Sequence, residues 1–124
     1  MKTVLFISSN KMLGQGLAAA IQSKSEFDFL WAAQLNYPQA SVGVHIIRAD
    51  VVILDIVDRV DMEQAVGICR SIRRNENIKI LLLVRPEQAV VRKVAVDTKN
   101  AGLVDDFVFY DSSLIYLLAK LEAL

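Results

Sequence analysis

The stretch VVILDIVD, residues 51–58, begins with four consecutive apolar residues and then places a carboxylate, Asp55, after them. A short run of β-branched and aliphatic residues predicts a strand. A strand without polar positions is buried on both faces, as central strands of parallel sheets are. The run therefore predicts the centre of a parallel sheet over residues 51–55. Asp55 at its end is either a cap of the next turn or a functional group.

Similar apolar runs alternate with longer amphipathic segments along the chain. Strands are expected at residues 3–7, 27–35, 51–55, 79–84 and 106–110. Helices are expected at residues 11–23, 38–48, 61–74, 86–99 and 114–124. Their start and stop signals are Asn36 with Pro38, a capping-box pattern of Asp61 and Gln64, Pro86, Ala101-Gly102, and Ser112 or Ser113.

Strands that alternate with helices of this length form right-handed βαβ units. The sequence therefore predicts an α/β fold of the flavodoxin-like type, a three-layer sandwich. Its five-stranded parallel sheet has the order 2-1-3-4-5, with helices on both faces.

Composition narrows the class of protein. With 54% hydrophobic and 23% charged residues, the 124-residue chain is expected to form a single packed domain over residues 1–124. The 14 basic residues equal the 14 acidic ones, which argues against direct binding of nucleic acid or an anionic membrane. No apolar window reaches the ~18 residues of a membrane span. The single cysteine, Cys69, forms no internal disulfide, so a cytoplasmic location is expected.

Ligands of open α/β sheets bind beyond the carboxyl ends of the strands, where the strand order reverses. In the predicted order, Ser8 and Ser9 after the first strand face Asp55 and Asp58 after the third. Val84 with Arg85, and Tyr110 with Asp111, follow the next two strands. The sequence therefore predicts that Asp55 lies in the crevice at the switch point.

The segment AGLVDDFVFYD, residues 101–111, is the most specific motif in the chain. With VVILD, ICRSIRRN, KILLLV and the fivefold strand-helix order, it resembles the receiver domain of two-component response regulators, whose matching segment is Ala-Gly-x-Asp-Asp-Tyr-Leu-x-Lys-Pro. The resemblance covers essentially the whole chain. It implies a phosphorelay module whose phosphoacceptor is Asp55. In that family two acids after strand one hold Mg²⁺, a Ser/Thr follows strand four, and a lysine follows strand five.

The other functional positions depart from the family pattern. The acidic pair falls on Ser8 and Ser9, the Ser/Thr on Val84 beside Arg85, and the lysine on Tyr110. Hydroxyl groups are poor ligands for Mg²⁺, and a tyrosine carries no positive charge at neutral pH. We therefore expect a degenerate pseudo-receiver without a resident cofactor. Asp58 is a weak candidate for a Mg²⁺ oxygen, and Arg85 for pairing a phosphate.

Other polar groups have structural interpretations. The Ser8-Ser9-Asn10 loop is suited to an anion cradle, but capping of the next helix by Asn10 is favoured. Cys69 is expected to be a buried thiol, and His45 is not expected to belong to a catalytic triad. A basic cluster is expected to be a solvated helix end; its members are Arg70, Arg73, Arg74 and Lys79.

The last predicted helix, LIYLLAKLEAL, has leucines on more than one face, and surplus apolar surface marks interaction sites. The expected interaction face comprises Tyr110, Leu114, Leu117, Leu118 and Leu121. The family resemblance implies docking of protein partners, such as a histidine kinase or an output domain, or a homodimer. Such contacts use the fourth helix, fifth strand and fifth helix. Alternatively, the helix continues into a linker that covers these leucines.

Three functions remain open from the sequence. The first is a non-enzymatic signal-transduction module of receiver type that acts through protein contacts. The second is a weakly phosphorylated receiver that uses Asp55 with a remodelled metal site. The third is a flavodoxin-like domain that binds a small ligand or nucleotide.

Overall fold

The apolar runs form the strands of one parallel sheet in the computed structural model, which describes residues 1–23, 27–75 and 77–124. Within these residues, five strands hydrogen-bond side by side in the order β2-β1-β3-β4-β5, and every neighbouring pair is parallel. The predicted strand order is therefore confirmed. The strands are β1 (Lys2–Ile7), β2 (Phe29–Leu35), β3 (Val51–Ile56), β4 (Lys79–Val84) and β5 (Asp106–Phe109).

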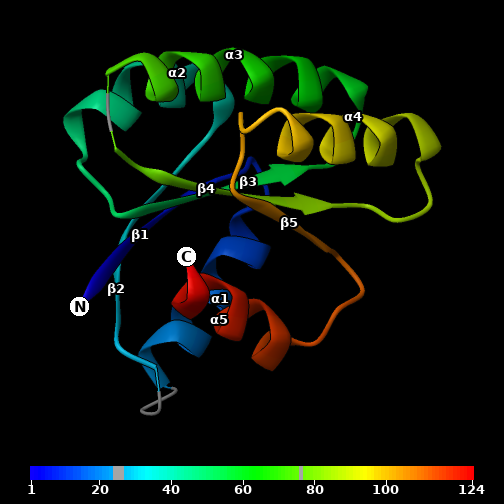
Figure 1. Cartoon of the computed structure of the whole chain (residues 1–124). Coiled ribbons are helices and arrows are strands. Elements are labelled where there is room, and N and C mark those ends of the chain that lie inside the picture. The colour runs from blue at the N-terminus through cyan, green and yellow to red at the C-terminus, as the bar shows by residue number, and fades with distance from the viewer. Residues whose placement is uncertain (24–26, 76) are drawn as a thin grey trace.

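Helices cover both faces of this sheet. Figure 1 shows α2, α3 and α4 on one face and α1 with α5 on the other, which confirms the flavodoxin-like three-layer sandwich. None of the helices in the described ranges is both long and apolar enough to cross a bilayer. The helices are α1 (Lys11–Ser23), α2 (Tyr37–Ile46), α3 (Arg59–Asn75), α4 (Ala89–Asn100) and α5 (Leu114–Ala123).

β3 lies between two hydrophobic cores, one on each face of the sheet. All six of its residues are buried. Val52 and Leu54 point into the core under α2, α3 and α4, whereas Val51 and Ile53 point into the core under α1 and α5. The strand runs one residue further than predicted, to Ile56, so that Asp55 lies inside it. The apolar run is thus explained by burial on both faces.

The start of α3 differs from the prediction, because Asp58 rather than Asp61 caps it. The Asp58 side chain accepts a hydrogen bond from the Asp61 amide at 2.9 Å, and the helix begins at Arg59. The Asp61 carboxylate in turn accepts from the amide of Val57 at 3.1 Å. An acid at the N-cap with a second one three residues later satisfies exposed amides of the first turn.

The start of α4 also lies further along the chain than predicted. Arg85 to Gln88 form a turn closed by a Gln88 amide to Arg85 carbonyl bond of 3.4 Å, with Pro86 at the second position, where its fixed φ is favourable. The helix therefore begins at Ala89 and not at Pro86. Its end is as expected, since Gly102 adopts φ 77° just beyond it.

The other helix signals act largely as predicted. Asn36 and Gln39 form a reciprocal capping box at the start of α2, which ends at Ile46, two residues before the expected end. Ser113, rather than Ser112, caps α5 by accepting from the Tyr116 amide at 3.1 Å.

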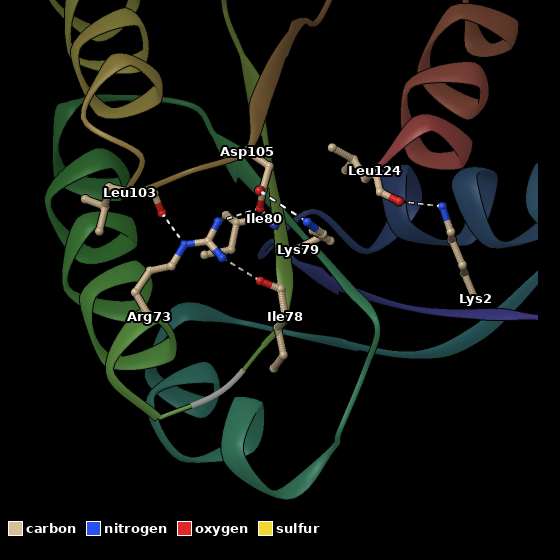
Figure 2. Close-up of polar contacts among 8 residues, drawn as sticks. All are labelled: Lys2, Arg73, Ile78, Lys79, Ile80, Leu103, Asp105 and Leu124. Carbon is tan, nitrogen blue, oxygen red and sulfur yellow. Dashed lines mark hydrogen bonds and ion pairs between the residues drawn. The ribbon is translucent and has the colours of Figure 1, made fainter.

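Arg73 is the centre of a network at the amino ends of β4 and β5, which Figure 2 shows. Its guanidinium donates to the carbonyls of Leu103 and Ile78 and to the carboxylate of Asp105. Asp105 also accepts from the Ile80 amide at 2.7 Å. Arg73 is therefore a structural tie between α3 and two loops, and the expectation that it belongs to a solvated helix end is wrong. Its neighbours Arg70 and Arg74 are exposed.

Lys2 joins the first strand to the last helix (Figure 2). Its ammonium donates to the carbonyls of Leu121, Glu122 and Leu124 at 3.2, 2.6 and 2.7 Å. These carbonyls lie at the C-terminal end of α5, where a cation is favourable to the helix dipole.

Gln34 of β2 shapes the loop that follows β1. Its amide nitrogen donates to the carbonyls of Ser8 and Asn10 at 3.0 and 2.9 Å. Gly14 of α1 faces this amide so closely that a Cβ at residue 14 would collide with the Gln34 side chain. Gly16, two residues further along α1, has open space where its Cβ would lie. Gly14 is therefore required for close packing, whereas Gly16 is not.

This difference predicts opposite stability effects for two alanine substitutions in α1. Gly16→Ala should raise the free energy of unfolding by about 0.5–1 kcal/mol, because alanine is the better helix former. Gly14→Ala should lower it by roughly 1 kcal/mol, because the added methyl group displaces Gln34 from two carbonyls. Urea unfolding of both variants measures the effects. An equal gain in the two would contradict the packing role of Gly14.

Candidate functional site

Four side chains converge at the carboxyl ends of the strands. They continue the alternation by which successive side chains of each strand point to opposite faces of the sheet. Ser8, Asp55, Arg85 and Tyr110 each follow by two positions a residue of the α1–α5 core. Successive residues of a strand point to opposite faces, so positions two apart share a face. The core residues that precede them are Phe6, Ile53, Leu83 and Val108.

Asp55 is almost completely enclosed, with 1% of its surface exposed. Its Oδ2 accepts a hydrogen bond from the Ser8 hydroxyl at 2.7 Å. The Ser8 oxygen in turn accepts from the Asn10 amide at 3.0 Å. Ser8 therefore anchors the β1–α1 loop to β3, while Ser9 is exposed. Asn10 caps α1 by accepting from the Leu13 amide at 3.0 Å, which confirms the capping interpretation.

Tyr37, which the sequence analysis did not single out, fixes the backbone at Asp55. Its hydroxyl donates to the Asp55 carbonyl at 2.7 Å, from the first turn of α2. The side chain is buried, and burial together with the charges of Asp61 and Asp55 raises the Tyr37 pKa above its ordinary value. Tyr37 is thus a neutral donor throughout the physiological range. The sequence signal that could have identified Tyr37 is its place directly after the Asn36 cap. A residue in the first turn of the helix that follows β2 lies near the carboxyl ends of the strands.

The charge of Asp55 is incompletely compensated. Burial raises the pKa of its carboxyl, whereas the Ser8 hydrogen bond and the positive charge of Arg85 oppose the rise. Nearby Asp61 raises it further. Among the described residues, no group donates a hydrogen bond to Oδ1. Burying the Asp55 carboxylate at the centre of the protein therefore costs free energy of folding.

Arg85 lies on the aromatic ring of Tyr110. Its guanidinium carbon is 3.5 Å from the ring centre, which is close contact for a cation–π interaction. The Tyr110 amide donates to the Val84 carbonyl at 2.7 Å and fixes the ring beside β4. Tyr110, which stands where the receiver family has a lysine, thus binds the guanidinium of Arg85 at the end of the neighbouring strand β4. The Val84 side chain is completely buried and offers no polar group.

The side chains here do not fit a Mg²⁺ site. The Ser8 hydroxyl is engaged by Asp55 and Asn10, and the Asp58 carboxylate by the first turn of α3. Mg²⁺ requires near-octahedral oxygen ligands, usually including carboxylates. In the described part of the chain, no group of three or more His, Cys, Asp or Glu side chains is arranged to hold a metal ion. The weak candidate Asp58 is therefore a helix cap.

The expected interaction face is largely buried. Leu117, Leu118 and Leu121 are 7%, 0% and 0% exposed because α5 packs them against the sheet and α1. They form core and not surface, so this part of the prediction is wrong. Leu114 and Tyr110 remain at the surface. The large side chains exposed there, at 36–48%, form what we call the β5–α5 patch: Phe109, Tyr110, Leu114, Ile115 and Tyr116.

An ion-pair network borders the β5–α5 patch. The Asp106 carboxylate binds the ammonium groups of Lys99 at 3.0 Å and Lys120 at 2.8 Å. Burial opposes ionisation of Asp106, but the hydrogen bonds from Lys120 and Lys99 together lower its pKa. Its bond also raises the pKa of Lys120. The network joins α4, β5 and α5 into one surface.

A groove of about 510 Å³ lies between α1 and α5, beside the β5–α5 patch. It opens at the carboxyl ends of β4 and β5, and its volume is within the range of small-molecule sites. The alternative of a ligand-binding domain stays a prediction, and this groove is the place for it. Apolar side chains that line it include Met12, Leu13, Leu17, Leu83, Leu114 and Leu117.

Two further expectations concern helices on the opposite face. Cys69 is 1% exposed and burial raises its pKa to about 12, which confirms the buried thiol. His45, in contrast, has a serine partner: its Nε2 lies 2.8 Å from the hydroxyl of Ser71. The pair connects α2 to α3 across 26 residues of sequence, and no local pattern indicates a contact over that separation.

Comparisons with known proteins identify related folds only. No family model matches the chain, and no curated protein matches it either. Among solved structures, it is similar to a DNA-binding response regulator of the LuxR family from Staphylococcus aureus, with 21% identity and a TM-score of 0.79. That match covers 99% of this chain and 98% of the other.

Two more response regulators match over nearly their full length. A two-component response regulator from Clostridium difficile is 20% identical, with a TM-score of 0.77 and coverage of 99% and 94%. The BeF3-activated N-terminal receiver domain of Klebsiella pneumoniae RstA is 19% identical, with a TM-score of 0.74 and coverage of 98% and 96%. The chain therefore has the receiver fold.

The buried charge of Asp55 predicts a pH-dependent gain from Asp55→Asn. The pKa of the Asp55 carboxyl is higher in the folded than in the unfolded state, so its ionisation lowers the free energy of unfolding at neutral pH. Below the unfolded pKa of about 3.9 the group is protonated in both states and this cost is absent. Asp55→Asn should therefore raise the free energy of unfolding at pH 7 by on the order of 1 kcal/mol. The gain should disappear near pH 3. Urea unfolding at both pH values measures it.

Asp58→Asn is the matched control, because asparagine keeps the oxygen that caps α3. Its stability should change little at either pH. A loss of stability in Asp55→Asn at pH 7 would show that the Asp55 charge is fully compensated, contrary to the prediction.

Proposed function

We propose that the chain is a non-enzymatic signal-transduction module of receiver type, acting through protein contacts, in which Asp55 is not an efficient phosphoacceptor. The observation that carries this proposal is the burial and hydrogen bonding of Asp55. The family resemblance assigns the phosphoacceptor position to Asp55 and a metal-binding acid to the position of Ser8. In this chain, Asp55 is 1% exposed and its carboxylate accepts a hydrogen bond from that serine.

Phosphoryl transfer depends on positioning and on neutralising charge at the transferring group. In this crevice Ser8 and Ser9 supply hydroxyls instead of carboxylates, and Asp58 caps α3. Each ~1.4 kcal/mol of stabilisation missing from the transition state costs a factor of ten in rate. Within the described residues, no group of three His, Cys, Asp or Glu side chains is arranged to hold a metal ion, so this pocket supports slow phosphorylation at most.

The β5–α5 patch is the surface through which we propose that the module acts. It carries aromatic and aliphatic side chains, beside the Lys99–Asp106–Lys120 network on β5 and its two flanking helices. Interfaces combine an apolar centre with a polar rim in this way. The family resemblance suggests a second copy, a histidine kinase or an output domain as partner. We propose the homodimer as the first to be tested.

The absence of efficient phosphorylation is directly measurable. Incubation with a small-molecule phosphodonor and Mg²⁺, followed by intact-mass spectrometry, should give no stable gain of one phosphoryl group. Asp55→Asn is the control that assigns any gain to this residue. A stoichiometric gain in the wild type that is absent from Asp55→Asn would establish a working receiver with a remodelled site.

Self-association through the β5–α5 patch is tested with a charge placed in it. Ile115, 48% exposed on α5, is changed to glutamate, and Val42, 62% exposed on α2, receives the same change as the control. Sedimentation equilibrium should show a dimer that Ile115→Glu weakens at least about tenfold, since a charge in an apolar interface is costly. Val42→Glu should leave it unchanged. A wild-type monomer at all concentrations would exclude the homodimer.

A further inference from the structure

Two buried polar atoms in the crevice have no hydrogen-bond partner among the described residues. They are Oδ1 of Asp55 and Nε of Arg85. One belongs to an anion and the other to a cation, and buried polar atoms are rarely left without partners. They belong to two oppositely charged side chains at one strand-end crevice, and neither atom bonds to the other.

The sheet places these residues on adjacent strands. Asp55 is in register with Leu83 of β4, so Arg85 follows two positions further along the neighbouring strand and on the same face. Its positive charge opposes the rise in the Asp55 pKa that burial causes. Asp61 adds a negative charge, and Ser8 adds a hydrogen bond. Within the described residues, Arg85 is therefore the cation that acts on this carboxyl.

The Tyr110 ring restricts Arg85 to this place. An arginine at a strand end has many rotamers and loses side-chain entropy when it is fixed in one of them. Stacking at 3.5 Å on an aromatic ring, which is itself held by the backbone bond to Val84, offsets part of that loss. A planar guanidinium stacks in this way, whereas a lysine ammonium does not present a flat face.

We propose that Arg85 is a built-in counter-ion of Asp55, held over the crevice by Tyr110. It is a positioning residue: it keeps the carboxylate charged and in place within the sheet, a task for which an acidic pocket otherwise uses a bound cation. The inference deepens the proposed function and rests on it, because it explains how this crevice keeps its acid without a metal site.

A double-mutant cycle tests the coupling. Arg85→Gln removes the charge and keeps a polar side chain of similar reach. At pH 7 it should raise the unfolding equilibrium constant about tenfold in the wild-type background, because it leaves a buried charge without its counter-ion. In the Asp55→Asn background the same change should have less than about a threefold effect. Equal effects in both backgrounds would overturn the proposal.

A second readout separates the counter-ion role from simple packing. The ¹³C chemical shift of the Asp55 carboxyl, followed against pH, reports its pKa. The pKa should rise in Arg85→Gln and rise less in Arg85→Lys, which keeps the positive charge but not the flat face that stacks on Tyr110. Tyr110→Leu should raise it by releasing Arg85, and Tyr110→Phe, which keeps the ring, should not. An unchanged pKa in Arg85→Gln would also overturn the proposal.

These measurements use neither phosphodonor nor Mg²⁺, so they fail independently of the proposed function. Loss of coupling would leave the phosphorylation result untouched. Conversely, efficient phosphorylation would overturn the proposed function and leave the measured coupling in place. If Arg85→Gln does not fold, the Tyr110→Leu and Tyr110→Phe pair still decides the outcome through the Asp55 pKa.

Discussion

The burial of β3 on both faces is the constraint on which the rest of the structure depends. A strand with cores above and below it requires helices on both sides of the sheet, and its neighbours β1 and β4 must also be apolar. The same burial surrounds Asp55, the acidic residue in this strand, with material of low polarity. Ser8 donates a hydrogen bond to this buried carboxylate, Tyr37 donates one to the Asp55 backbone carbonyl, and the charge of Arg85 opposes the cost of burial.

Much of the fold could be predicted because it depends on period and burial. The runs 51–55 and 79–84 indicated central strands, and the alternation of strands with helices gave the sheet order. The starts of α3 and α4 were predicted wrongly because two neighbouring residues, or two local structures, satisfy the same sequence signal. Asp58 and Asp61 are both acids that can cap α3, and in the structure it is Asp58 that accepts from the first turn. Pro86 suits a turn and a helix start equally well.

The site was harder to predict because distant segments create it. Asp55 and its neighbours were identified from strand ends and family resemblance, but the Arg85–Tyr110 stack depends on the register of β4 and β5. A signal was present in the sequence: Arg85 and Tyr110 each follow a core residue by two positions. The buried leucines of α5 illustrate the opposite difficulty. Apolar residues on more than one helix face do not reveal how much of the helix the sheet and α1 cover.

The crevice also constrains how such a module can switch. A population shift requires a group that interacts differently with two states. In this chain the Val84 side chain offers no hydrogen bond. Arg85, whose positive charge acts on Asp55, stacks on Tyr110, which belongs to the β5–α5 patch. A change in the charge of Asp55 therefore changes the electrostatic attraction on Arg85, while the backbone bond to Val84 still anchors Tyr110. If the module responds to a signal in this crevice, the stack is the element that transmits it, because it alone, among the described contacts, touches both the buried acid's cation and the exposed patch.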